Sequence, residues 1–145
     1  MSTNKQLKPS RICNCINLRR ASQAITQFYD ELLRPSGLKV TQYSLLRHLQ
    51  YFGALSMGEL SQATRLERTT LVRNLKVLEK MGLICITASQ APQANQVCIT
   101  DRGSEALETA LPYWEQAQER TKDLFTADEF LVLRRALRKI ESLGL

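Results

Sequence analysis

The sequence predicts a mainly α-helical fold with one small β-sheet, and three observations lead to this prediction. Apolar residues recur at helical spacing through most of the 145-residue chain. The spacing changes after Gly82, where residues 83–87 and 97–100 form two short runs rich in β-branched side chains. Directly before these runs, residues 57–82 read as two helices joined by a tight turn. These segments predict a winged helix-turn-helix at residues 38–101, within a single domain that spans residues 1–145.

The composition fits a cytoplasmic protein that binds a polyanion. Hydrophobic residues make up 43% of the chain, which is enough for a core, and the formal net charge is +6. No apolar stretch reaches the length of a membrane span, and the polar N-terminus does not read as a signal peptide. We therefore expect no membrane association, and the positive charge favours nucleic acid as a partner.

Two helices are expected before the helix-turn-helix. The first covers residues 10–34, with Ser10 as its N-cap and Pro35 and Gly37 at its end. Its apolar stripe comprises Leu18, Ala21, Ile25, Phe28 and Leu32. The second covers residues 42–52 with Thr41 as its N-cap, and residues 54–55 then suit a very short strand.

The helix-turn-helix carries clear end signals. Ser56 followed by Glu59 forms a capping box that begins a short helix over residues 57–63. The turn covers residues 64–66, and the second helix covers residues 67–81 before Gly82 ends it.

The second of these helices has the two faces that a DNA-recognition helix needs. Leu71, Leu75 and Leu78 share one apolar face. Thr69, Arg73, Lys76 and Lys80 point the opposite way. Arg and Asn side chains suit guanine and adenine edges in the major groove. The alternative is an ordinary amphipathic helix with a solvated face.

The two ends of the chain carry more apolar surface than a winged helix requires. A helix over residues 103–125 is followed by a capping box at Thr126 and Glu129, and by a last helix with a regular apolar stripe. That stripe comprises Phe130, Leu133, Leu137 and Ile140. We therefore expect residues 10–34 and 103–145 to form the interface of a homodimer.

The four cysteines show no metal-site or catalytic spacing. Cys13, Cys15, Cys85 and Cys98 lack a CxxC motif, and His48 is the only histidine. We expect no metal, no cofactor, no disulfide framework and no enzymatic activity, with His48 in a structural role. In a reducing cytosol the cysteines are expected to be free thiols, with Cys85 and Cys98 packed in strands as small buried hydrophobes.

The order of these elements resembles the MarR family of bacterial and archaeal transcriptional regulators. The resemblance covers roughly residues 12–143 and is carried by residues 29–33 (YDELL), 37–46 (GLKVTQYSLL), 57–60 (MGEL), 68–75 (RTTLVRNL), 78–84 (LEKMGLI) and 99–103 (ITDRG). It implies a homodimeric repressor that binds a palindromic operator in double-stranded DNA and is released by a small aromatic effector. It also implies that the residues facing the major groove are Arg68, Thr69, Thr70, Arg73 and Asn74. Lys76 lies on the same exposed face and is added to this set. Ser56 and Thr64 are the candidate contacts to DNA phosphates.

The predicted wing departs from the family pattern. The family usually carries an Asp and, two positions later, an Arg just before the last strand, where this chain has Ala91 and Gln93. Residues 89–96 contain no positive charge. We therefore expect no arginine in the minor groove, and any wing contacts should come from neutral Gln or Asn side chains.

Two alternatives remain open. Cys15 and Tyr29 are similar in position to residues of the peroxide-sensing branch of the family, in which tyrosine hydroxyls hold a reactive cysteine, although a second tyrosine of that pattern is replaced by Arg19. Cys15 is therefore either a redox sensor or a packing residue at the dimer interface. The uncharged wing also allows a winged-helix protein-interaction module that does not bind DNA.

Overall fold

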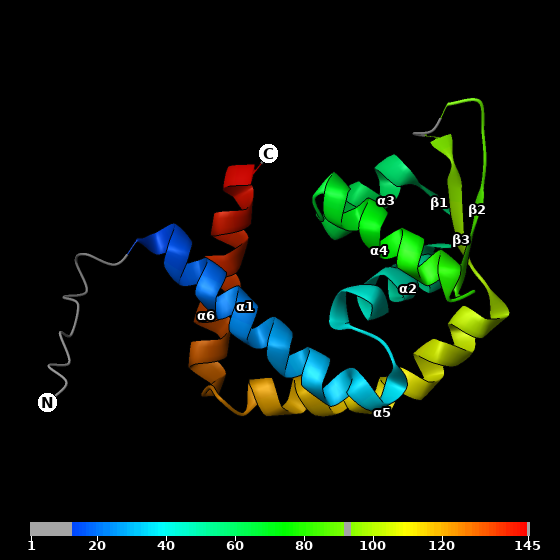
Figure 1. The fold of residues 1–145 in the computed structure, drawn as a ribbon. Helices are drawn as coiled ribbons and strands as arrows, with labels where there is room; N and C mark the ends of the chain where they lie inside the picture. Colours follow the sequence, from blue (N-terminus) through cyan, green and yellow to red (C-terminus); the bar gives the residue numbers. More distant parts are fainter. Residues whose placement is uncertain (1–12, 92–93, 145) are drawn as a thin grey trace, which may run out of the picture.

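The computed structural model describes residues 13–91 and 94–144, and within them it confirms the predicted mainly helical fold with a small sheet (Figure 1). The α-helices are α1 (Asn14–Leu33), α2 (Val40–Phe52), α3 (Met57–Thr64), α4 (Arg68–Lys80), α5 (Asp101–Lys122) and α6 (Ala127–Glu141). The strands are β1 (Leu55–Ser56), β2 (Ile84–Thr87) and β3 (Gln96–Ile99). Short 3-10 turns, η2 (Arg34–Ser36) and η4 (Ser142–Gly144), follow α1 and α6.

The sheet joins the wing to the start of the helix-turn-helix. Its strand order is β1-β3-β2, and both pairs are antiparallel. Leu55 of β1 pairs with Val97 of β3, so the short strand expected near residues 54–55 becomes the third strand of the wing sheet. The Val97 side chain is fully buried and fixes the inner face of the sheet on the core.

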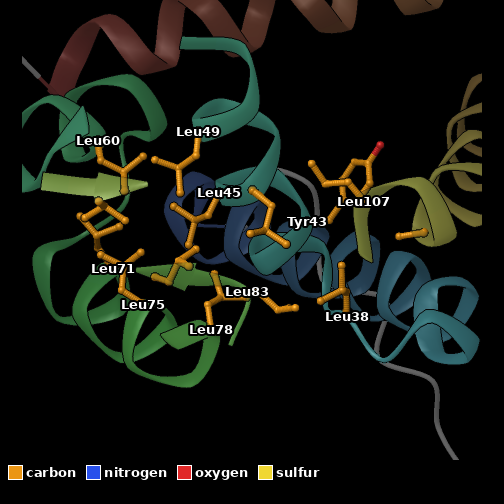
Figure 2. Close-up of a cluster of buried hydrophobic side chains, with 14 of the residues drawn as sticks. Leu38, Tyr43, Leu45, Leu49, Leu60, Leu71, Leu75, Leu78, Leu83 and Leu107 are labelled. Carbon is orange, nitrogen blue, oxygen red and sulfur yellow. The ribbon is translucent and has the colours of Figure 1, made fainter. Parts of the chain in front are cut away.

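A leucine-rich core connects α4, the second helix of the helix-turn-helix, to the rest of the chain (Figure 2). Leu71, Leu75 and Leu78 are each at most 1% exposed, as the predicted stripe requires. They pack in one cluster with Leu45 and Leu49 of α2. Because protein interiors are close-packed, this cluster holds α4 in a fixed orientation and leaves its opposite face free.

The end signals of the helix-turn-helix act as expected. The Glu59 N–H donates to Ser56 Oγ at 3.1 Å, which caps α3. In the turn, Arg65 adopts the left-handed conformation with φ 55°, and Gly82 adopts it after α4 with φ 75°.

The start of α2 differs from the prediction. The helix begins at Val40, preceded by Lys39, and Thr41 lies inside it rather than capping it. The reason is that the first N–H groups find other partners: Val40 N–H donates to Asp30 Oδ1 at 2.8 Å, and Lys39 N–H donates to Gln42 Oε1 at 3.0 Å. The Asp30 bond ties α2 to α1. The predicted cap Ser10 lies outside the described residues, and Cys13 precedes α1.

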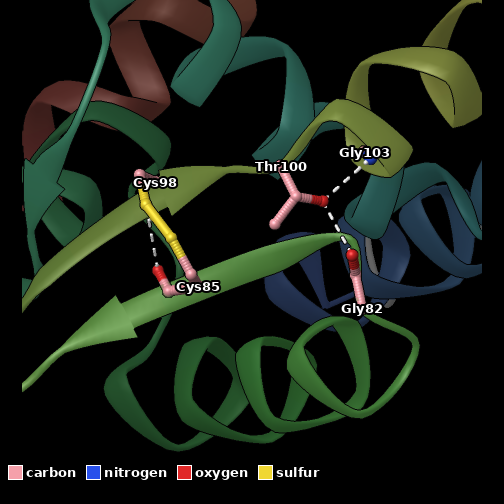
Figure 3. Close-up of a disulfide and its surroundings, with 5 residues drawn as sticks. All are labelled: Gly82, Cys85, Cys98, Thr100 and Gly103. Carbon is pink, nitrogen blue, oxygen red and sulfur yellow. Dashed lines mark hydrogen bonds between the residues drawn. A yellow bond between two sulfur atoms is a disulfide. The ribbon is translucent and has the colours of Figure 1, made fainter.

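The start of α5 is packed unusually closely on the wing (Figure 3). Thr100 Oγ1 donates to the Gly82 carbonyl at 2.7 Å and accepts from the Gly103 N–H at 3.1 Å. A Cβ atom at Gly103 would lie 2.1 Å from the Leu83 carbonyl oxygen. Only glycine permits this approach, so one threonine and one glycine join the end of α4, the wing and α5.

The expectation that Cys85 and Cys98 are free, buried thiols is wrong, because they form a disulfide (Figure 3). The antiparallel register places the two residues directly opposite each other, with 5.4 Å between their Cα atoms. This separation is within the range that a disulfide spans. Their neighbours Ile84 and Val97 take the buried inner face, so the disulfide lies on the outer face and Cys85 is exposed.

Apolar side chains on α1 and α6 remain uncovered within the chain. None of the residues of α6 is buried, and its exposed large hydrophobic residues include Leu131, Val132, Leu137 and Ile140. Ile16 and Ile25 of α1 are 53% and 48% exposed. In Figure 1 α6 stands at the end of α5 opposite the wing, and α1 runs alongside α5. None of the helices in the described part of the chain is long and apolar enough to cross a membrane.

Candidate nucleic-acid interface and effector pocket

The outer face of α4 is cationic and open. Arg68, Thr69, Arg73 and Lys76 are all exposed, and with Val72 and Val77 they line a shallow surface depression. Lys80 continues the same face at the C-terminal end of the helix. The buried leucine stripe on the other side keeps these side chains directed outward. An exposed helix with this chemistry can enter a major groove and offer charged donors to bases and phosphates.

Two predicted groove residues are held within α4 itself. Thr70 and Asn74 are half-buried, and Asn74 Nδ2 donates to the Thr70 carbonyl at 2.8 Å. An asparagine that reads adenine needs both its donor and its acceptor. Asn74 keeps its second amide N–H and its Oδ1 for a base, but the bond to Thr70 fixes the direction in which both can point.

The two predicted phosphate contacts differ in what they can donate. Ser56 Oγ accepts from the Glu59 N–H, so its own proton is free for a phosphate oxygen. Thr64 Oγ1 donates to the Leu60 carbonyl at 2.8 Å, which uses its proton. The geometry therefore favours Ser56 as the phosphate contact.

The wing has no charge to contribute. Residues 83–100, from the end of α4 to the start of α5, contain no Asp, Glu, Lys or Arg. Within the loop, the Ser89 N–H donates to Asn95 Oδ1 at 2.8 Å and the Ser89 hydroxyl donates to the Ala91 carbonyl at 2.6 Å. Any contact of this wing with DNA would therefore depend on neutral hydrogen bonds.

A second hollow lies between α1, α2 and α5. Tyr43 stacks on Trp114 with 5.4 Å between ring centroids, and the Arg47 guanidinium lies 6.0 Å from the Tyr43 centroid and 5.6 Å from that of Trp114. The other lining residues are Ile25, Thr26, Tyr29, Val40, Ser44 and Gln118. The hollow thus combines aromatic walls with one exposed cation.

The Tyr43 hydroxyl lines this hollow as an unsatisfied group. It is buried, and its proton has no acceptor among the described residues, because the Arg47 guanidinium beside it can only donate. Burial raises the pKa of Tyr43, and the nearby Arg47 charge opposes this shift. The hydroxyl therefore stays protonated at neutral pH, and it can donate to an acceptor atom of a bound molecule. Sequence reasoning missed Arg47 because nothing in the i, i+4 spacing of Tyr43 and Arg47 shows that Trp114 joins them.

The structure does not bring Cys15 and Tyr29 together within the chain. Both lie on α1, fourteen residues apart, which corresponds to about 21 Å along the helix. The Tyr29 hydroxyl donates to Gln118 Oε1 and lies 3.2 Å from Thr121 Oγ1, so it joins α1 to α5. Cys13 and Cys15 are exposed free thiols, and redox sensing by Cys15 stays a prediction. His48 bonds the Ser44 carbonyl at 2.7 Å, and no cluster of three metal-binding side chains occurs within residues 13–91 and 94–144.

Comparison with known proteins agrees with this architecture. A family model described as MarR family matches residues 36–92. The crystal structure of the M. tuberculosis transcriptional regulator MosR is 34% identical, with 92% of this chain and 94% of that chain covered and a TM-score of 0.76. The structure of MosR in complex with DNA has the same identity and coverage, with a TM-score of 0.77. An uncharacterized HTH-type transcriptional regulator of Bacillus subtilis, YwaE, is 28% identical over 127 residues, covering 86% of this chain and 74% of the relative. The fold, the exposed cationic helix and these relatives together show that the chain belongs to the MarR family of transcriptional regulators.

Proposed function

We propose that this regulator acts in the cytoplasm as a homodimeric repressor that binds a palindromic operator through α4. The observation that carries the proposal is the face of α4, on which Arg68, Arg73 and Lys76 are exposed opposite a fully buried leucine stripe. A related regulator, MosR, has been solved in complex with DNA. In the complex, α4 would enter the major groove, and Ser56 would donate a hydrogen bond to a neighbouring phosphate.

The uncovered apolar faces of α1 and α6 support the dimer. Large apolar patches on a soluble protein mark interaction sites, and a second copy of the same chain offers the same faces in return. A two-fold dimer would present its two α4 helices to half-sites one helical turn apart, at about 34 Å.

Replacing Arg73 with alanine should reduce the discrimination between operator and unrelated DNA by about 1–3 kcal/mol, the usual value of one bidentate base contact. The control is Lys80→Ala, at the far end of the same face, which should weaken all duplexes alike or have no effect. Binding of both variants to operator and scrambled duplexes would be measured by fluorescence anisotropy. An equal loss on both duplexes for Arg73→Ala would show that Arg73 contacts phosphate rather than a base.

A protein-interaction module is the competing function, supported by the uncharged wing. Selection from a random pool of duplexes, followed by a salt titration, separates the two functions. Operator binding requires an enriched sequence with two half-sites. It also requires that the logarithm of the binding constant fall linearly with the logarithm of the salt concentration, with a slope of about −0.9 for each phosphate neutralised. A module that does not use DNA would enrich no sequence.

We further propose that the hollow between α1, α2 and α5 binds a small aromatic anion that releases DNA. Tyr43 and Trp114 offer ring faces, Arg47 offers a positive charge, and the Tyr43 hydroxyl offers an unused proton. An aromatic carboxylate satisfies all three, because its ring stacks and its oxygens accept from both donors. The hollow joins the helices expected in the dimer interface to α2 of the reading unit, so an occupant can alter the spacing of the α4 helices.

Arg47→Met should weaken binding of 2-hydroxybenzoate, used as the probe, by about tenfold or more, because a charge-assisted hydrogen bond contributes roughly 1.5–3 kcal/mol. The matched control is Arg134→Met, since Arg134 lies over the Phe130 ring of α6, outside the hollow. Calorimetry gives the affinity, and anisotropy gives the release of DNA. Release by the probe that is unchanged in Arg47→Met would place the effector elsewhere.

A further inference from the structure

The Cys85–Cys98 disulfide fastens an edge strand (Figure 3). In the order β1-β3-β2, the central strand β3 pairs on both sides, whereas β2 pairs only with β3. Beyond Cys85, β2 continues for only two residues, Ile86 and Thr87, before the loop begins. The disulfide therefore cross-links β2 and β3 close to the tip of the wing.

The rest of the wing is held unevenly. The base is secured by buried Ile84 and by the Thr100 hydroxyl on the Gly82 carbonyl. On the tip side of the disulfide, buried Val97 anchors the central strand β3, where it pairs with Leu55 of β1 and lies opposite Ile86 of β2. Toward the tip, Cys85 and Thr87 are exposed and Ile86 is only half-buried. Without the disulfide, the outer end of β2 would be kept in place by backbone pairing with β3 and by the half-buried Ile86 side chain on the core. Such segments open at low free-energy cost.

We propose that Cys85 and Cys98 form a reversible thiol–disulfide switch that sets the DNA affinity of the protein through the order of the wing. This inference rests on the proposed DNA-binding function. Oxidation by a hydroperoxide begins when one thiolate attacks the peroxide oxygen, which gives a sulfenic acid and an alcohol. The opposite thiol then displaces water and forms the S–S bond. In the reverse direction, two thiols of a small reductant supply two electrons and two protons and become a disulfide themselves.

The exposed position makes the pair accessible to both reagents. Cys85 lies on the outer face of the sheet, away from the core. A thiol that attacks a disulfide must reach a sulfur atom along the S–S axis, and an exposed edge strand allows this approach. Cys85 and Cys98 need no movement of the core to be reduced, because their side chains do not enter it.

The oxidised form should bind DNA more tightly. With no charge between residues 83 and 100, the wing can contribute only short-range hydrogen bonds, which require the donors and acceptors to be in place. A wing ordered beforehand loses less conformational freedom on binding. The cations on α4 do not change with oxidation, so the number of phosphates neutralised should stay the same.

The experiment compares two double variants of the full chain. Cys13→Ser with Cys15→Ser keeps only the wing pair, and Cys85→Ser with Cys98→Ser keeps only the pair near α1. Each is prepared reduced with dithiothreitol and oxidised with hydrogen peroxide, and thiols are counted by alkylation and mass spectrometry. Operator affinity is then measured over a range of salt concentrations, and hydrogen exchange of residues 84–99 is followed in both forms.

For the variant that keeps the wing pair, we expect oxidation to remove both thiols, slow exchange in the wing and raise operator affinity roughly 3- to 10-fold with an unchanged salt slope. The variant that lacks the wing pair should show none of these changes. Equal affinity of the two forms, or a redox effect that follows Cys13 and Cys15, would overturn the switch while DNA binding itself stands. Absence of operator binding in every form would overturn the proposed function and the switch with it.

Discussion

Leu137→Glu combined with Ile140→Glu should convert the protein to a monomer and weaken operator binding by about 100-fold or more. The two side chains are 42% and 40% exposed on α6, which buries none of its residues within the chain. Placing two carboxylates in an apolar interface opposes association because each would lose its hydration. A monomer can bind only one half-site. It therefore loses the high effective concentration that the second subunit of a bound dimer has at the second half-site.

The control for this variant adds the same charges to another exposed apolar pair. Tyr51 and Phe52 are 82% and 58% exposed at the end of α2, away from α1 and α6 in sequence. Tyr51→Glu with Phe52→Glu should leave the oligomeric state unchanged. Sedimentation velocity at micromolar concentration checks both variants. A Leu137/Ile140 variant that still sediments as a dimer would place the interface on other surfaces.

Gly103→Ala should destabilise the protein by about 3 kcal/mol or more, at the upper end of the usual cost of overpacking. In a helix, alanine is ordinarily favoured over glycine by nearly 1 kcal/mol, at about 0.8–1.0. Here the added Cβ would lie 2.1 Å from the Leu83 carbonyl oxygen and 2.6 Å from Ile99 Cγ1. The Leu83 carbonyl oxygen accepts a hydrogen bond from the Thr100 N–H, so it cannot move aside without disrupting the wing.

The matched control is Gly58→Ala in α3. A Cβ there would meet only Ser56 Oγ, at 4.0 Å, so the substitution should be neutral or stabilise the protein by up to roughly 1 kcal/mol. Urea unfolding followed by circular dichroism at one protein concentration measures both. If Gly103→Ala unfolds at the wild-type midpoint, α5 must be able to shift away from the wing.

Local signals in the sequence were sufficient for most of the helices and for the wing. Ser56 and Thr126 are confirmed as N-caps. In each cap the side-chain oxygen accepts from an N–H only three residues later, so the local sequence is enough to predict the bond. The leucine stripe of α4 is confirmed because its spacing determines which face meets the core. These features depend on residues close together in sequence, and so the sequence alone can show them.

Features that depend on contacts between distant segments were missed. Thr41 was predicted to cap α2, but Asp30, ten residues before Val40, provides the partner for the first N–H of the helix. The Cys85–Cys98 bond needed the register of β2 on β3, which strand propensity does not specify. The approach of Arg47 to Trp114 depends on how α2 packs against α5. The DNA contacts of Arg68, Thr69, Thr70, Arg73, Asn74 and Lys76 stay predictions.

The junction at Thr100 has a mechanical consequence. The 22 residues of α5, with Pro112 among them, span about 33 Å along the helix. One end of α5 is attached to the wing and to the end of α4, and the other end leads to α6. A tilt of about 5° at the α6 end would swing the opposite end by about 3 Å, close to the 3.4 Å rise of one base pair. In the proposed dimer, α5 would turn a small rotation between the two subunits into a displacement large enough to move α4 out of register with its half-site.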